Sequence, residues 1–328
     1  MNVLLTGATG FVGSHVVDVL IERGIDVTYI ARSSSNHRWL QGKNARLVEG
    51  SLHDLASLKS AVDGADAVIH IAGQTAGKNE EDFRRGNELA TRNLVDAVLA
   101  YRPQLERFTH ISSLAVCGPA ASAEQPVRED HDRKPLTAYG RTKKLAEDVV
   151  LQAMSQMPAT IVRPPVVYGQ RDQATLTFFQ TVNRGVSPLI GFDEKILSFI
   201  HVRDLARGIV EATLSPRTVG ETYFVSSDEF YTWPQISNVS AAVLGRRKLL
   251  TVRLPHAVVM GIAGTVGALG KLTGKPPVLD YEKGIDMTQK YWICSTDKAR
   301  DHFGYRQQVS LNDGLLETIT WYREQGWL

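Results

Sequence analysis

The feature that most constrains the fold of this chain is a glycine-rich turn near its N-terminus. Residues 3–6 form a short apolar run, and the chain continues Gly7-Ala-Thr-Gly10-Phe-Val-Gly13 into a helical pattern that ends at Gly24. Glycine permits a tight turn, a close approach of backbone to phosphate, and close packing of helix on strand. Glycines at these intervals between a strand and a helix therefore predict a dinucleotide site at the helix N-terminus.

The pattern of apolar residues predicts the fold class. Over the first third of the chain, short β-branched runs alternate with longer segments of helical period, as expected of a parallel sheet. We expect an α/β chain with a doubly wound, parallel-sheet Rossmann domain and a smaller, irregular C-terminal substrate domain. Strands are predicted at 3–6, 26–31, 45–49, 67–71, 107–111 and 160–162, and helices at 10–23, 81–100 and 137–155.

The domain boundaries follow from where this alternation stops. We expect the Rossmann domain to span 1–168, with 199–226 returning to it, and the substrate-binding region to comprise 169–198 and 227–328. The second region looks irregular because prolines at 188, 234, 255, 276 and 277 divide it into short pieces.

Charge and cysteine content exclude several classes of function. Lys and Arg number 37 against 35 Asp and Glu, a net charge of +2, and no long run of one sign could follow nucleic-acid phosphates. Cys117 and Cys294 form no metal-ligand pattern, so we expect neither a metal site nor a nucleic-acid partner. The N-terminus lacks a basic and apolar leader, and we therefore expect a cytoplasmic protein.

The end of the second predicted strand indicates which dinucleotide binds. Arg32 lies 19 residues after Gly13, where an acidic residue would bind the ribose 2′-hydroxyl of NAD. A guanidinium suits the 2′-phosphate of NADP instead, and Ser33, Ser34 and Arg38 can add donors or charge. We expect a preference for NADP, with NAD also possible.

Three residues predict the chemistry. Tyr139 and Lys143 lie four apart in a predicted helix and therefore project from one face. The ammonium stabilises the phenolate, so that the tyrosine can exchange a proton with a carbinol oxygen. Ser113 follows a predicted strand at the sheet edge where ligands bind, and its hydroxyl can polarise the same carbonyl. Each has a plain alternative, since such a Tyr-Lys pair is common on helix surfaces and serine is common in turns.

The motifs at residues 6–13, 87–93, 112–118, 139–143, 163–169 and 199–204 occur in this order along nearly the whole chain. Together they resemble the extended short-chain dehydrogenase/reductases of the NAD-dependent epimerase/dehydratase superfamily. The resemblance implies that Ser113, Tyr139 and Lys143 are catalytic. With the residues argued above, it implies a cofactor site formed by Gly7, Thr9, Gly10, Phe11, Val12, Gly13, Arg32, Ser33, Ser51, Leu52, Ile71, Ala72, Gly73, Tyr139, Lys143, Pro164 and Val167.

Departures from the family pattern narrow the reaction. Family dehydratases carry an Asp-Glu pair where this chain has Leu114-Ala115, and Ser51 replaces the usual acid near the adenine. Nucleotide-sugar epimerases bind the substrate diphosphate with an Asn and with a later Arg. In this chain Pro165-Val166 stand at the first of these positions and residues 195–198 at the second, where Lys195 is the only charged residue. The sequence instead resembles the branch of 3β-hydroxysteroid dehydrogenases and dihydroflavonol reductases, which act on bulky apolar alcohols and ketones. A nucleotide-sugar epimerase and a non-catalytic NADP sensor remain alternatives.

Segment 254–272 is predicted to form an apolar helix. Gly261, Gly264, Gly267 and Gly270 recur every third residue among apolar residues, which fits either a core helix or a helix on a membrane surface that admits a lipophilic substrate. In the second case the protein is peripheral to the inner face of a membrane, with Lys271 and Lys275 at the headgroups. The resemblance also implies a homodimer. His70 and His201 are expected to be buried and hydrogen-bonded.

Overall fold

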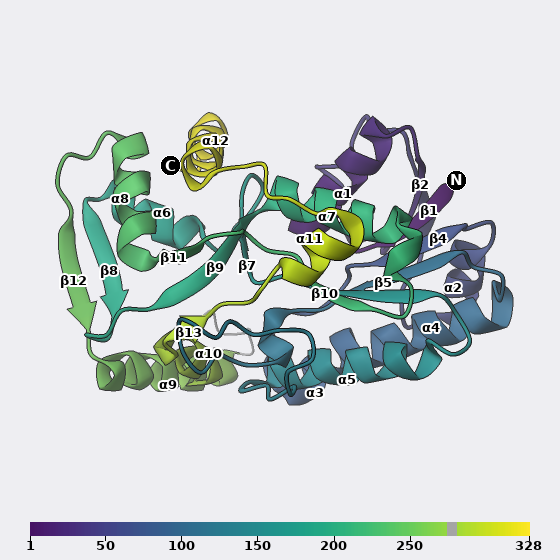
Figure 1. Cartoon of the computed structure of the whole chain (residues 1–328), viewed down its shortest axis with the longest axis horizontal. Coiled ribbons are helices and arrows are strands. Elements are labelled where there is room, and N and C mark those ends of the chain that lie inside the picture. The colour runs from purple at the N-terminus through teal and green to yellow at the C-terminus, as the bar shows by residue number, and fades with distance from the viewer. Residues whose placement is uncertain (274–280) are drawn as a thin grey trace.

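Seven parallel strands form the large sheet of this protein, seen in a computed structural model that describes residues 1–273 and 281–328 (Figure 1). Their order is β10-β6-β5-β4-β1-β2-β3. Because β1 lies between β2 and β4, the direction of winding reverses there, and ligands of such sheets bind at the carboxyl ends beside this point. The strands are β1 (Asn2–Thr6), β2 (Asp26–Ala31), β3 (Ala45–Glu49), β4 (Ala67–His70), β5 (Arg107–Ile111), β6 (Ala159–Arg163) and β10 (Thr222–Phe224).

Helices cover both faces of this sheet, which explains why its central strands are apolar on both sides. One face carries α1 (Phe11–Glu22) and α7 (Val202–Leu214), and the other carries α2 (Leu55–Val62), α4 (Ala90–Tyr101) and α5 (Ala138–Ala153) (Figure 1). Each face has its own buried apolar cluster, with Leu5, Val17 and Ile209 in the first and Leu4, Leu94 and Val150 in the second. The predicted fold class is confirmed.

The helix predicted at 81–100 is interrupted. Residues Glu80–Arg84 form α3, Arg85–Leu89 form a π-helical turn, and α4 follows. π-Helical turns are rare and frequently accompany functional sites. A Cβ added to Gly86 in this turn would lie 2.6 Å from the Gln74 side chain, so the turn packs closely on the segment after β4.

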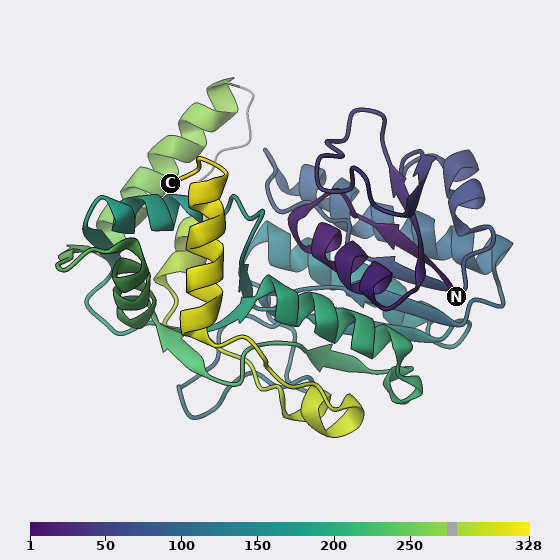
Figure 2. The same cartoon turned by 90° about the horizontal axis from the view of Figure 1, so that it is seen from above.

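The C-terminal part is more regular than we expected. It contains α6 (Leu176–Asn183), α8 (Trp233–Leu244), α9 (His256–Thr273), α10 (Tyr281–Thr288) and α12 (Leu311–Glu324). Two small sheets accompany these helices: β8 (Val186–Ile190) pairs with β12 (Leu250–Leu254), and β9 (Ile196–His201) pairs with β7 (Val166–Tyr168), β11 (Phe230–Thr232) and β13 (Tyr291–Trp292). In Figure 2, α12 lies between the other helices of the C-terminal part and the large sheet. Helix α11 (Asp297–Phe303) contacts β10.

The prediction that prolines divide this region into short pieces is wrong for two of them, because they lie at helix starts. Pro234 lies in the first turn of α8, where Thr232 and Gln235 form a capping box, and Pro255 immediately precedes α9. The prolines at 276 and 277 lie outside the described residues.

Segment 254–272 forms most of α9, and its sides differ in burial. Val259 and Ala263 are buried, whereas Val258 and Ile262 are exposed. Within the described ranges, no helix combines the length and apolar character needed to cross a membrane.

Candidate active site

The glycine-rich turn fits the role that its sequence predicts. Gly7 has φ of +75°, and a Cβ added there would lie 2.7 Å from the Ala72 nitrogen. A Cβ on Gly13 would lie 2.1 Å from the Gly7 oxygen, so neither position accepts another residue without movement of the backbone. The Gly10 nitrogen donates to the Gly7 oxygen at 3.0 Å, which closes the turn.

The N-terminus of α1 is open to an anionic ligand. Its N-cap residue, Gly10, provides no side-chain cap, and no acidic residue occupies the first turn. Thr9, Gly10, Phe11 and Val12 retain solvent exposure. Unpaired backbone N–H groups and the positive end of the helix dipole favour a phosphate at such a place. This turn therefore fits the pyrophosphate of a dinucleotide.

The three predicted catalytic residues converge at the carboxyl end of β5. Ser113 follows this strand, and its side chain lies close enough to the hydroxyl of Tyr139, in the first turn of α5, to influence the pKa of that phenol. Lys143, one turn further along α5, is buried and donates from Nζ to the Ile111 oxygen at 2.6 Å. Thr137 caps this helix by accepting a hydrogen bond from the Gly140 nitrogen at 3.3 Å, which fixes where the helix begins.

Burial and charge set the pKa values of this group. Burial raises the pKa of the Tyr139 phenol, while the Ser113 side chain lowers that pKa and the Asp286 carboxylate raises it. Burial lowers the pKa of Lys143 to about 8, although the Glu147 carboxylate opposes the shift. Such perturbed residues at a strand end are typical of sites that exchange protons.

A line of hydrogen bonds joins the end of β1 to α5. Thr6 Oγ1 lies 2.7 Å from His70 Nδ1, and His70 Nε2 lies 2.9 Å from Thr91 Oγ1. Thr91 donates to the Asn87 oxygen at 2.7 Å, and Asn87 Nδ2 donates to Thr142 Oγ1 at 3.0 Å. Burial lowers the pKa of His70 to about 3, so its neutral ring can donate through one nitrogen and accept through the other. These bonds fix α5, which carries Tyr139 and Lys143, relative to the glycine-rich turn.

The segment after β4 lies between these two elements. The Ala72 nitrogen donates to Thr6 Oγ1 at 3.2 Å. A Cβ added to Gly73 would lie 3.0 Å from Asn87 Oδ1 and 3.8 Å from Lys143 Nζ. Ile71, Ala72 and Gly73 keep partial exposure and can line a cofactor. On the other side of Ser113, the Pro164 oxygen accepts from the Leu114 nitrogen at 2.9 Å, and Val167 in β7 is partly exposed.

Ser51 and Leu52 lie after β3, where the resemblance implies the adenine. Ser51 Oγ accepts from the His53 nitrogen at 3.2 Å, so the hydroxyl that replaces the usual acid supports a local turn. The Leu52 oxygen accepts from Asn93 Nδ2 at 2.8 Å, which explains the role of this second asparagine in the motif at 87–93.

Two cations act on one imidazole beside the predicted adenine site. Arg32 and Ser33 are exposed. The pKa of His53 is lowered first by burial and then by the charges of Arg85 and Arg32. Arg85 lies in the π-helical turn after α3, so the spacing after Gly13 gave no sign of it. Arg38 instead stacks over the Trp39 ring at 4.1 Å.

Lys195, the one charged residue of segment 195–198 where the resemblance implies a diphosphate grip, is engaged by the protein. Its Nζ donates to the Thr288 oxygen at 2.6 Å and to the Gln289 oxygen at 3.3 Å, and lies 3.5 Å from an Asp193 oxygen. The side chain is buried. The ammonium therefore holds the C-terminal end of α10.

Other candidate groups stay apart from the site. His201 is buried as expected, but the prediction that it is hydrogen-bonded is wrong: no described group pairs with its ring, which packs edge-on to Tyr168 with centroids 5.2 Å apart. The described residues contain no cluster of His, Cys, Asp or Glu that could hold a metal ion. Cys117 and Cys294 are free and buried.

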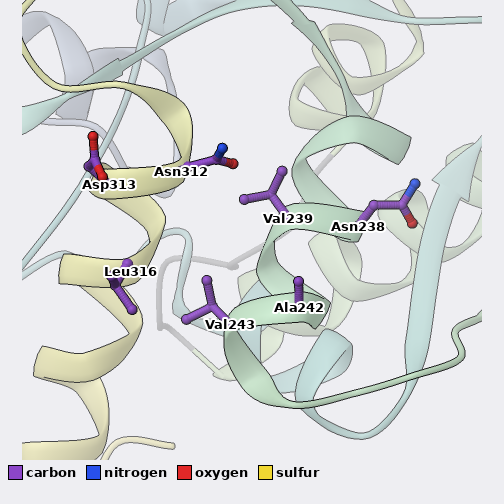
Figure 3. Close-up of a pocket in the computed structure, with 7 residues that line it drawn as sticks. All are labelled: Asn238, Val239, Ala242, Val243, Asn312, Asp313 and Leu316. Carbon is purple, nitrogen blue, oxygen red and sulfur yellow. The ribbon is translucent and has the colours of Figure 1, made fainter.

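An open groove lies between α8 and α12 (Figure 3), away from the elements that carry Tyr139 and the glycine-rich turn. None of the predicted site residues lines it. Four apolar side chains line it, those of Val239, Ala242, Val243 and Leu316. Three polar side chains complete the lining: Asn238, Asn312 and Asp313.

Comparisons with known proteins identify the family and the fold. Residues 3–232 match the NAD dependent epimerase/dehydratase family. A ceramide reductase of Caulobacter vibrioides is 31% identical, over 99% of this chain and 96% of its own. A decarboxylating sterol-4-alpha-carboxylate 3-dehydrogenase of Dictyostelium discoideum is 27% identical, over 96% and 99% of the two chains. A UDP-glucose 4-epimerase of Thermotoga maritima, solved with UDP-glucose, shares the fold with a TM-score of 0.80 at 23% identity, over 99% of both chains.

Proposed function

Because the chain belongs to the NAD dependent epimerase/dehydratase family and is an enzyme that uses a nicotinamide cofactor, we propose that it interconverts a secondary alcohol and a ketone on a bulky, largely apolar molecule. The bound nicotinamide supplies or accepts the hydride. Tyr139 gives a proton to the carbinol oxygen or takes one from it, and Ser113 hydrogen-bonds the same oxygen. Lys143, one turn further along the same helix, would supply the positive charge that favours the phenolate.

The environment of Lys195 is the observation that favours an alcohol/ketone oxidoreductase rather than a nucleotide-sugar epimerase. An epimerase must hold the diphosphate of its substrate, and charged donors serve that purpose best. Here the ammonium is buried and bonded to two carbonyl oxygens of the chain. Two relatives are named for lipids, a ceramide and a sterol, and these names also support a lipophilic substrate.

The dinucleotide that we propose is NADP. The charges of Arg32, which follows β2, and of Arg85 both act on the His53 ring, and together they would offer the charge that a 2′-phosphate requires. The residues proposed to hold the remainder of the cofactor are those of the glycine-rich turn, Ser51 and Leu52 near the adenine, residues 71–73, and Pro164 with Val167 at the nicotinamide. In this assignment residues 1–168 and 199–226 bind the cofactor, and 169–198 with 227–328 bind the substrate.

One titration experiment separates the reductase from the epimerase. The purified protein is titrated calorimetrically with NADP, NAD, UDP-glucose and GDP-mannose, and its NADPH consumption is then followed with long-chain and steroid ketones. We expect NADP to bind more tightly than NAD, no binding of either nucleotide sugar, and NADPH consumption with at least one ketone. Tight binding of a nucleotide sugar, with turnover that leaves the cofactor unchanged, would establish the epimerase instead.

We propose further that α9 rests on an anionic membrane surface from which the substrate enters. Val258 and Ile262 are exposed by 44% and 45% on one side of this helix. Residues 230–279 contain no Asp or Glu, so no acidic side chain of this segment would repel an anionic surface. An exposed apolar helix face without acidic side chains is compatible with a helix that lies in the membrane interface. The side chain of Lys271 and all of Lys275 lie outside the described residues.

The proposal also covers the oligomeric state of the protein and its location in the cell. The exposed apolar side chains Leu145 and Leu151 of α5 and Tyr101 of α4 offer a surface for a second copy of this chain. We propose a homodimer through these helices. The two free, buried cysteines are compatible with a reducing compartment, and we propose the cytoplasmic side of the membrane.

A further inference from the structure

Helix α10, from the C-terminal part, is bonded to the helix that carries Tyr139. The Glu282 carboxylate in the first turn of α10 accepts a hydrogen bond from the Ala138 nitrogen, which belongs to the first residue of α5. The first N–H groups of a helix have no partner within the helix itself. Thr137 accepts from the Gly140 nitrogen, and Glu282, 144 positions further along the chain, accepts from that of Ala138. A distant part of the chain therefore completes the start of α5.

A second bond from Glu282 reaches α5 on the other side of Tyr139. Arg141 Nη2 donates to Glu282 Oε1 at 2.8 Å. The same guanidinium donates from Nε to Glu80 Oε1 at 3.1 Å and from Nη2 to Glu80 Oε2 at 2.7 Å. Because a guanidinium carries five N–H donors, it can bind both carboxylates at once. Arg141 thus joins α3, α5 and α10 two residues after the tyrosine.

Helix α10 is also held at points away from α5. Near its C-terminal end, Lys195 Nζ donates to the Thr288 oxygen at 2.6 Å. On the side facing α9, a Cβ added to Gly284 would lie 3.0 Å from the sulfur of Met260 and 3.1 Å from the Ala263 side chain, so the two helices pack closely. Because α10 has a defined position of its own, its carboxylate can hold the start of α5 in place.

The ring of Tyr139 lies against the third helix of this network. It packs edge-on to Phe83 of α3, with ring centroids 6.4 Å apart, and Phe83 is buried. Phe83 lies three residues after Glu80, which binds Arg141. The bonds of Arg141 therefore hold α3 beside the tyrosine ring, while Glu282 holds the backbone before and after it.

We propose that Glu282 is a positioning residue of the reaction: through the Ala138 nitrogen and Arg141 it fixes the first turn of α5, and with it the position of the Tyr139 hydroxyl. This inference rests on the proposed function, in which Tyr139 exchanges the proton. A displacement of about 1 Å can cost on the order of 10²-fold in rate, so a carboxylate that does not touch the substrate can still govern turnover. The C-terminal part of the chain then has a role besides binding the substrate.

The test measures kcat, KM and the affinity for NADP in the full-length protein, with active sites counted from the stoichiometry of NADP titration so that unfolded protein is left out. For Glu282→Ala we expect kcat to fall at least about tenfold, while KM and the NADP affinity change by less than about threefold. Glu282→Gln should recover part of the lost kcat, because its amide oxygen can still accept from the Ala138 nitrogen.

The matched control is Glu317→Ala, which removes the carboxylate of another ion pair between helices, formed with Arg203 at 2.8 Å. This pair joins α12 to α7, and the variant should leave kcat unchanged. An unchanged kcat in Glu282→Ala, or an equal loss in Glu317→Ala, would overturn the inference.

A double-mutant cycle tests the route through Arg141. Arg141→Ala should also lower kcat, because it removes one of the two attachments between Glu282 and α5. The loss in the double variant Glu282→Ala, Arg141→Ala should be smaller than the product of the two single losses, since both changes remove the same bond. Losses that multiply would contradict a shared action of the two residues on Tyr139.

A spectroscopic measurement keeps the inference separate from the proposed reaction. The protein is labelled with fluorotyrosine, and the fluorine resonance of Tyr139 is identified by its absence in Tyr139→Phe. Glu282→Ala should shift or broaden this resonance, because the ring is no longer held against Phe83, whereas Glu317→Ala should leave it unchanged. A parent that reduces no ketone would overturn the reaction alone. An unchanged Tyr139 resonance in Glu282→Ala would overturn the inference, whatever the turnover of the parent.

Discussion

Glu147 and Arg163 form a bidentate ion pair in the interior of the protein, with Arg163 Nε and Nη2 donating to the two carboxylate oxygens at 2.8 and 2.7 Å. Both side chains are almost fully buried. Arg163 ends β6 directly before Pro164, and Glu147 lies one turn after Lys143 on α5. The pair therefore joins the strand end proposed to contact the nicotinamide to the helix that carries Tyr139 and Lys143.

Replacing Glu147 with Gln should destabilise the protein by about 3–5 kcal/mol, because it leaves a buried guanidinium without its counter-charge. The free energy of unfolding is measured by urea denaturation, with the slope checked for two-state behaviour. Asp132→Asn is the matched control, since Asp132 pairs with Lys134 on the surface, where both are more than three-quarters exposed. The control should not differ measurably from the parent. A small loss in Glu147→Gln would mean that the charge of Arg163 is satisfied by other groups.

Tyr139→Phe should reduce turnover by roughly 10²–10⁴-fold, because it removes the group that exchanges the proton while the ring remains. Cofactor binding should change little, since the pyrophosphate site lies on α1. Turnover is measured by NADPH consumption, and binding is measured by calorimetric titration. Loss of cofactor binding in this variant would show that the hydroxyl is required for the structure of the site.

Much of this site could be read from the sequence because its parts are local. The glycine spacing, the strand before it, and the four-residue interval between Tyr139 and Lys143 each follow from short-range geometry. Ser113 could be placed because it follows a strand, and parallel strands end at one edge of the sheet.

What the sequence did not reveal depends on distant parts of the chain. Glu282 of α10 accepts a hydrogen bond from the Ala138 nitrogen at the start of α5, and no short-range spacing predicts a contact between residues 144 positions apart. The regularity of the C-terminal part was hidden for a different reason. Pro234 and Pro255 stand at helix starts, where the lack of an N–H costs nothing, although their presence looked like an interruption.

Lys143 should make stability depend on pH in a defined direction. Its pKa in the folded protein is about 8 against an ordinary 10.5, because burial disfavours the ammonium. Between these values the unfolded chain binds more protons, so the free energy of unfolding contributed by this residue rises with pH across that window. Below pH 8 its ammonium is a constant cost, and above 10.5 that cost is gone.

The measurement is denaturation at several pH values for the cofactor-free parent and for Lys143→Met. The parent should gain stability relative to the variant as the pH rises from about 8 to 10.5. Comparing the two proteins removes the contribution of other groups that titrate in this range. A constant difference across the window would mean that the ammonium is not destabilised by burial.

Arg32→Ala should weaken NADP binding by about ten- to a hundredfold while leaving NAD binding nearly unchanged, since only NADP carries the 2′-phosphate. Arg85→Ala should act in the same direction if its charge lies near that phosphate, as its effect on His53 indicates. Arg128→Ala, an exposed residue whose partner is Asp297, is the control. Equal losses for both dinucleotides would contradict the assignment of Arg32 to the 2′-phosphate.

Replacing both Val258 and Ile262 with Ser should reduce binding to vesicles that contain anionic phospholipid by about tenfold or more, because these exposed side chains of α9 would enter the interface. Binding is measured by flotation with vesicles of neutral and of mixed composition, and salt should weaken it only for the mixed vesicles. The matched control is Leu55→Ser with Leu316→Ser, which alters two exposed apolar residues on α2 and α12. Equal flotation of both double variants would show that α9 is not the contact. A parent that floats with neither vesicle, but whose dimer dissociates when α9 is changed, would identify this helix face as an interface between copies of the chain.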